Sequence, residues 1–146
     1  MPEKLANPAP LGLACFALTT FLLSAVNAEL AQRDLLGAVV SVALVYGGVV
    51  QIMAGMWEIK GGSTFGGVAF SSYGGFWISF GLILILEFLG ICTVSPTALG
   101  VFLLAWTLFT FYLWVATFSL NKALVSTFTL LLLTFSLLDI GHLASI

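Results

Sequence analysis

Five apolar stretches of about 20 residues constrain this chain more than any other feature. They cover residues 10–28, 36–57, 66–86, 98–118 and 122–140. An α-helix rises about 1.5 Å per residue, so about 20 residues cross a hydrocarbon core about 30 Å thick. The sequence therefore predicts an all-α, polytopic membrane protein. We expect an N-terminal segment over residues 1–9, followed by a helical bundle over 10–146 with about five transmembrane helices.

Composition excludes several other classes of protein. Hydrophobic residues make up 61% of the chain and charged residues only 7%, whereas soluble domains are about 45–50% apolar and about 25% charged. Lipid must therefore cover the exterior. A net charge of -2 provides no basic patch, which excludes nucleic-acid binding. Cys15 and Cys92 lack a C-x-x-C spacing, so we predict no metal site and no cofactor.

The sequence does not predict an enzyme. It contains one His and neither an H-E-x-x-H motif nor a G-x-S-x-G motif. Glu58, Glu87 and Asp139 all fall at the ends of predicted spans. At such positions we expect carboxylates that touch water at the membrane surface.

The basic residues predict the orientation in the membrane. Lys4, Lys60 and Lys122 would lie on one side and Arg33 on the other, and the basic side is normally cytoplasmic. The first apolar stretch is too long for a cleaved signal and is followed at once by charge and a second span. We therefore expect a multi-pass protein of the plasma or cell inner membrane with a cytoplasmic N-terminus.

Glycines and polar residues occur inside the predicted spans. Paired glycines predict close helix packing, as at Gly47-Gly48, Gly66-Gly67 and Gly74-Gly75. The amide of Gln51 lies in mid-span, where an interhelical hydrogen bond and a water-filled cavity both remain open. Helical spacing also predicts three weakly polar faces, although hydroxyls can bond to their own helix. The faces are Phe16, Thr20, Leu23 and Asn27; Ser72, Gly75 and Ser79 beside Tyr73; and Thr107, Thr110, Trp114 and Thr117.

A helix start is encoded near the N-terminus. Asn7 can cap a helix, Pro8 and Pro10 suit a first turn, and Gly12 follows. The free N–H groups and positive dipole of a helix start attract anions. Helix capping alone, without any bound anion, accounts for these residues equally well.

Three motifs together resemble a known family. They are Asn7-Pro8-Ala9-Pro10-Leu11-Gly12-Leu13, then Tyr46-Gly47-Gly48 with Gln51, and Phe70-Ser71-Ser72-Tyr73-Gly74-Gly75-Phe76-Trp77. They are similar to those of the acetate uptake transporter family, also called the succinate-acetate permease or GPR1/FUN34/YaaH family. The resemblance implies a proton-coupled carrier or channel for acetate, related small carboxylates such as lactate and, in some members, succinate. It also implies a homo-hexamer with a pore in each protomer.

The resemblance further implies roles for single residues. Phe16, Tyr73 and Leu131 match a hydrophobic constriction, and Asn7, Thr20, Gln51 and Thr110 are candidates for its polar lining. The family pattern has six helices, and we expect the sixth to be absent from this chain. The alternative is therefore a non-transporting membrane assembly or signalling protein that lacks a complete pore.

Overall fold

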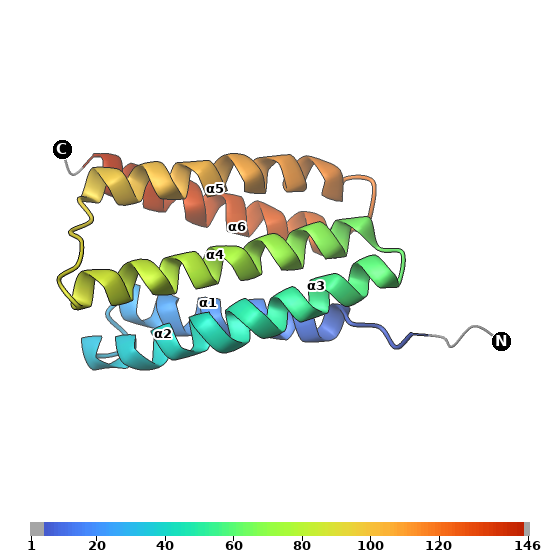
Figure 1. Cartoon of the computed structure of the whole chain (residues 1–146). Coiled ribbons are helices and arrows are strands. Elements are labelled where there is room, and N and C mark those ends of the chain that lie inside the picture. The colour runs from blue at the N-terminus through green and yellow to red at the C-terminus, as the bar shows by residue number, and fades with distance from the viewer. Residues whose placement is uncertain (1–4, 145–146) are drawn as a thin grey trace. The chain divides into compact units, whose positions relative to one another are not determined.

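A computed structural model describes residues 5–144, in which every regular element is helical (Figure 1). The chain begins with α1 (Ala9–Asn27) and a short 3₁₀ turn, η1 (Arg33–Leu35). The second span is continuous and joins α2 (Leu36–Leu44), the π-helical segment η2 (Val45–Val50) and α3 (Gln51–Lys60). Three long helices follow: α4 (Thr64–Phe88), α5 (Pro96–Thr117) and α6 (Lys122–Leu143).

The predicted membrane fold is confirmed. Five helical segments are long and apolar enough to cross a bilayer, with the second running from Leu36 to Lys60. The predicted spans agree with the observed helices to within about three residues at each end, which is near the usual uncertainty of helix boundaries. The structure adds the π-helical turns, which the apolar pattern did not predict.

The chain divides into two compact units. The first, Met1–Ile91, contains α1, the α2–α3 segment and α4; the second, Cys92–Ile146, contains α5 and α6 as a helical hairpin (Figure 1). Side-chain caps begin three of the long helices. Ser63 Oγ accepts from Gly66 N, Ser95 Oγ from Ala98 N, and Asn121 Oδ1 from Leu124 N. These bonds satisfy amide groups that a helix start leaves free.

Glycines bring the second span and α4 into backbone contact, as the sequence predicted. A Cβ added to Gly74 would lie 2.9 Å from the carbonyl oxygen of Gly48. A Cβ added to Gly55 would lie 3.1 Å from the carbonyl oxygen of Gly67. Side chains larger than hydrogen would separate the helices at both levels. The two contacts set an antiparallel register between the segments.

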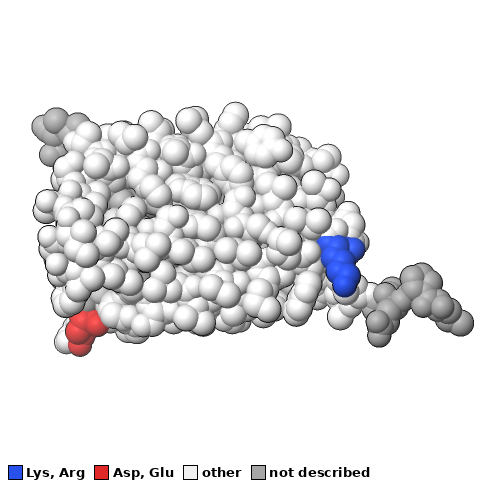
Figure 2. Space-filling model, viewed as in Figure 1, with Lys and Arg blue, Asp and Glu red and all other residues white. Residues whose placement is uncertain are grey.

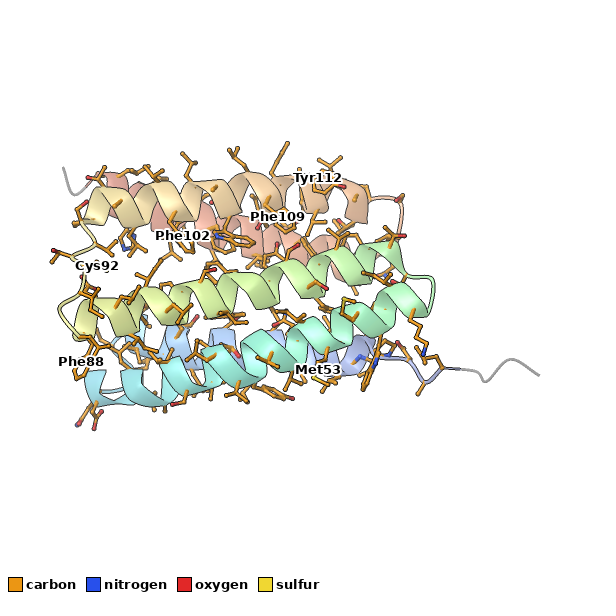
Figure 3. The ribbon with its side chains drawn as sticks, viewed as in Figure 1. Met53, Phe88, Cys92, Phe102, Phe109 and Tyr112 are labelled. Atoms are coloured by element: carbon orange, nitrogen blue, oxygen red, sulfur yellow. The ribbon has the colours of Figure 1, made fainter. Side chains whose placement is uncertain are left out.

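The outer surface carries large apolar side chains. Met53 and Tyr112 project outward from α3 and α5 (Figure 3), with 47% and 62% of their areas exposed. On the visible face of the first unit, acidic atoms lie beside the start of α2 and basic atoms beside the end of α3 (Figure 2). Between them the surface is uncharged. An apolar band with charges at its ends suits a bilayer.

Candidate functional site

Gln51 is the central polar residue of the first unit. It is the first residue of α3, directly after the π-helical turns, and its side chain is completely buried. Neither its amide nitrogen nor its amide oxygen has a hydrogen-bond partner among the described residues. π-Helical turns often occur at functional sites because they redirect side chains. Because both amide atoms of Gln51 lack a partner among the described residues, the interhelical hydrogen bond that the sequence left open is not formed.

Ser71 lies at the same level as Gln51. The contacts Gly48–Gly74 and Gly55–Gly67 bracket both residues, one on each segment. The Ser71 hydroxyl is also buried without a partner among the described residues, and it packs against Gly55. This level of the α3–α4 interface therefore holds unsatisfied donors and acceptors from two segments.

The polar face predicted for α4, with Ser72, Gly75 and Ser79, is not the face of the helix that is buried. Ser79 is exposed and donates to the carbonyl of Gly75, 2.8 Å away, and Ser72 is half-buried. The buried face holds Ser71 and Gly74 instead. The serines offer two overlapping helical stripes, and the glycine contacts place the stripe with Ser71 against the second span.

Two of the three residues expected at the constriction are in contact. The rings of Phe16 and Tyr73 have their centroids 5.3 Å apart, with an interplanar angle of 57°. Phe16 is half-buried on α1, and Tyr73 is buried on α4. Leu131 lies on α6 in the second unit, where it is half-buried.

Polar groups on α1 and α4 extend this interior. The Thr20 hydroxyl and the Trp77 indole N–H are buried without hydrogen-bond partners among the described residues. The predicted stripe on α1 is only partly inward, since Asn27 is exposed while Thr19 is fully buried. Thr19 donates to the carbonyl of Cys15, so its hydroxyl is satisfied.

The N-terminal motif forms a helix start, but Asn7 is not the cap. Pro8 precedes α1 without a capping side chain, and Pro10 lies in the first turn as predicted. Asn7 Oδ1 instead accepts from Ala9 N at 3.1 Å, two residues along the chain. Gly12 is required for packing, because a Cβ there would lie 2.6 Å from the ring of Phe70.

A cavity of about 450 Å³ lies beside this helix start. Its polar lining includes Asn7, Glu58, Lys60 and Ser63. Glu58 is buried, with 6% of its area exposed, and its carboxylate packs against Gly66 in the first turn of α4. The expectation of a water-exposed Glu58 is therefore wrong, because the positive end of α4 offers a carboxylate a favourable interior position. Glu87 is exposed, as expected.

In the second unit, the polar face predicted for α5 lies against α6. Thr110 and Thr117 are fully buried, and the other two members of the face bond to α6. Trp114 Nε1 donates to Thr129 Oγ1 at 2.8 Å, and Thr107 Oγ1 lies 2.7 Å from Asp139 Oδ2. Asp139 was expected at the membrane surface, but it is 6% exposed because it turns toward α5. His142 Nδ1 lies 2.8 Å from the carbonyl oxygen of Leu138.

Sequence reasoning did not single out the inward roles of Ser71, Trp77, Glu58 and Asp139. For Ser71 a signal existed, because Gly67 and Gly74 lie four and three residues from it on the same helical face. For Asp139 the partner is 32 residues away. No group of three His, Cys, Asp or Glu residues within 5–144 could hold a metal ion.

The whole length of the sequence matches one family model. The match to the GPR1/FUN34/yaaH family covers residues 1–146. The chain belongs to the GPR1/FUN34/yaaH family. This match confirms the family resemblance that was inferred from the sequence motifs.

Named relatives and a solved structure agree with this assignment. Ammonia transport outward protein 2 of Saccharomyces cerevisiae is 49% identical over 96% of this chain and 52% of its own length. The succinate-acetate/proton symporter SatP of Escherichia coli is 43% identical over 97% of this chain and 74% of its own length. The structure of the bacterial acetate channel SatP superposes with a TM-score of 0.91 at 41% identity, covering 97% of this chain and 78% of that one. The chain spans about half the length of several curated relatives, including the yeast protein.

Proposed function

We propose that this chain passes acetate and related small carboxylates, including succinate, across a membrane in a proton-linked manner. The single observation that carries the proposal is the completely buried amide of Gln51, which has no hydrogen-bond partner among the described residues. A buried polar group without a partner is costly, so its retention at a helix interface calls for a ligand or water. The family relatives named for acetate and succinate transport supply the ligand class.

The level of Gln51 and Ser71 offers neutral donors to a carboxylate. The amide N–H of Gln51 and the hydroxyl of Ser71 can donate, and the amide oxygen can accept from a protonated acid. Lys or Arg at this level would hold an anion firmly, whereas conduction requires a site that the substrate can leave. Thr20 on α1 and Thr110 on α5 are the further polar residues that we assign to the lining.

The Phe16–Tyr73 pair serves as the constriction in this proposal. Its rings are in contact, and an apolar narrowing can exclude water while it is closed. The resemblance also implies a role for Leu131 of α6 in narrowing the pathway. The cavity beside Asn7 would be the cytoplasmic entrance, where Lys60 attracts anions and Pro8, Pro10 and Gly12 shape the helix start.

The finer features of the assembly also belong to the proposal. We assign a cytoplasmic N-terminus in the plasma or cell inner membrane, no enzymatic activity, and a homo-hexamer with one pathway in each protomer. Closed symmetric rings are the usual form of homo-oligomers. Native mass measurement in nanodiscs should give six copies, and a population of monomers alone would contradict the hexamer.

Ammonia is a second candidate substrate, favoured by the name of the yeast relative. The amide of Gln51 can both donate and accept, so its chemistry also suits ammonia. Transport of ammonia and transport of carboxylates therefore have to be measured side by side.

Uptake into liposomes tests the proposal. Vesicles that contain the full chain should accumulate labelled acetate faster than empty vesicles, and Gln51→Leu should reduce that rate while Met53→Leu, on the exposed face of α3, should not. Uptake of methylammonium by the wild-type chain without uptake of acetate would favour ammonia. Acetate uptake no faster than in empty vesicles, with folded protein present, would refute carboxylate transport.

A further inference from the structure

The helices α1 and α4 run parallel where they pack together in the first unit. A Cβ added to Gly12 would lie 2.6 Å from the ring of Phe70. Four residues later on α1, the ring of Phe16 contacts that of Tyr73. Residue numbers therefore increase together along the two helices. Positions one turn beyond the ring contact, about 3.6 residues further on each helix, share the next level of the interface.

Thr20 and Trp77 occupy this next level, on α1 and α4 respectively. The hydroxyl oxygen of Thr20 and the indole nitrogen of Trp77 are both buried, and neither has a hydrogen-bond partner within residues 5–144. A buried donor without a partner is costly, and buried polar groups are normally hydrogen-bonded. Two such donors at one level of an interface call for a partner that the described part of the chain does not supply.

The Thr20 hydroxyl does not bond to its own helix. A hydroxyl in a helix can donate to the carbonyl four residues before it. The adjacent Thr19 does so, with its oxygen 2.8 Å from the carbonyl oxygen of Cys15, and Ser79 of α4 bonds to Gly75 in the same way. Thr20 makes no such bond to a described residue. Its hydroxyl is therefore available to a ligand.

The indole of Trp77 is a fixed donor. Its ring packs edge-on against those of Phe76 and Phe80, with centroids 5.1 and 6.4 Å apart, and the residue is only 2% exposed. An indole N–H can donate a hydrogen bond but cannot accept one. It therefore suits a ligand with a lone pair, such as a carboxylate oxygen. It does not suit an ammonium cation, which has no lone pair.

We propose that Thr20 and Trp77 together form a second binding station for a carboxylate group, in addition to the level of Gln51. Trp77 lies beyond Gly74, which bounds that level, so the station is one turn further along the pathway. The indole N–H and the Thr20 hydroxyl each donate to the carboxylate. α1 and α4 contain no Lys, Arg or His. The station thus holds an anion with neutral donors, which the substrate can leave.

The ring contact controls access to this station. Both donor atoms are enclosed in the structure, and the rings of Phe16 and Tyr73 touch one turn before them. A carboxylate that enters from the cavity beside Asn7 therefore reaches the two donors only when the rings separate. The inference rests on the proposed function for the class of ligand, whereas binding at the station is observable without flux.

Solid-state NMR of the full chain in liposomes, with the indole nitrogens isotope-labelled, tests binding directly. Titration with sodium acetate in a constant background of sodium chloride should shift the Nε1 signal of Trp77. The signal of Trp114 is the internal control, because its N–H already donates to Thr129 at 2.8 Å and should not move. Methylammonium chloride, whose cation cannot accept a hydrogen bond, should leave the Trp77 signal in place.

The Trp77 signal can be assigned in two ways. Trp77→Phe should remove it from the spectrum of the folded protein. If that variant does not fold, Trp57→Phe, Trp106→Phe and Trp114→Phe assign it by elimination.

Thr20 and Thr19 provide a matched pair of variants. Thr20→Val removes one donor to a charged group and should weaken the acetate dependence of the Trp77 signal about tenfold. Thr20→Ser keeps the hydroxyl and should respond as the wild type does. Thr19→Val should also respond as the wild type does, because the Thr19 hydroxyl is already bonded to the carbonyl of Cys15.

The outcomes separate the station from the proposed function. A Trp77 signal that acetate does not move, in protein that takes up acetate, would overturn the station and leave the proposed function standing. Equal weakening in Thr20→Val and Thr19→Val would also overturn the station, because an effect on packing alone gives that result. Folded wild-type protein without acetate uptake would refute the proposed function, and the titration would still decide whether the station binds a carboxylate.

Discussion

Gln51 and Ser71 lie at one level of the α3–α4 interface, between the backbone contacts Gly48–Gly74 and Gly55–Gly67. Glycines hold the two segments close on either side of this level, so the side chains of Gln51 and Ser71 stay enclosed between them. Both polar groups are buried without hydrogen-bond partners among the described residues. The packing therefore preserves a polar position in the interior that stability alone does not favour.

Replacing Gln51 should accordingly stabilise the protein. Gln51→Leu removes a donor and an acceptor that are buried without partners among the described residues, and such groups each cost about 1–3 kcal/mol. We expect the free energy of unfolding in detergent to rise by about that amount. Ser71→Ala should act in the same direction. A clear loss of stability in Gln51→Leu would mean that the amide makes hydrogen bonds that hold the fold together.

The glycine contacts predict position-dependent effects of alanine on α4. A Cβ at Gly67 would press on Ile59 and lie 3.3 Å from the carbonyl of Gly55, so Gly67→Ala should lower the free energy of unfolding by about 1–3 kcal/mol. At Gly75 nothing lies within 4 Å of an added Cβ. Gly75→Ala should therefore be neutral or stabilising by about 0.5–1 kcal/mol. Thermal unfolding of both variants checks the difference, and equal melting temperatures would contradict the register described here.

Leu131 and its neighbour Leu130 form a matched pair. Leu131 is half-buried and belongs to the proposed constriction, whereas Leu130 is 66% exposed on the same helix. Leu131→Ala should raise the flux of lactate relative to acetate and cost about 2–5 kcal/mol if the site is well packed. Leu130→Ala should leave the ratio unchanged. Flux per folded protein separates the effects, and an unchanged ratio in both variants would remove Leu131 from the constriction.

The two native cysteines allow a direct test of the orientation. Cys92 is exposed in the segment between α4 and α5, and Cys15 is buried. With a cytoplasmic N-terminus, Cys92 lies outside and should react with a membrane-impermeant maleimide in intact cells. In a Cys92→Ser background, Lys60→Cys should react only after permeabilisation. Labelling of the Lys60→Cys variant in intact cells would reverse the assigned orientation.

The membrane fold could be predicted from the sequence because each span is a long local signal. The apolar runs and the glycine pairs both act through neighbouring residues or through one helix face. The π-helical turns could not be predicted in this way. They shift backbone hydrogen bonds without changing the apolar pattern.

The site was only partly predictable for a related reason. Gln51 and the pair Phe16 and Tyr73 were singled out, the first by its polarity in mid-span and the pair by resemblance. Which serine of α4 faces inward depends on the register with α3, and the inward position of Asp139 depends on a partner 32 residues away. Lys4, which entered the prediction of orientation, lies outside the described residues.

The acetate-to-lactate flux ratio of constriction variants in liposomes tests the central claim most directly. Phe16→Ala and Tyr73→Ala each remove one ring of the observed contact, while Phe21→Ala removes a ring from the same helix as Phe16 that is 68% exposed. If carboxylates pass this contact, both site variants should shift the ratio toward lactate, the larger acid, because the narrowest point widens. Phe21→Ala should keep the wild-type ratio. Folded wild-type protein without carboxylate flux, or one common ratio for all three variants and the wild type, would contradict the account.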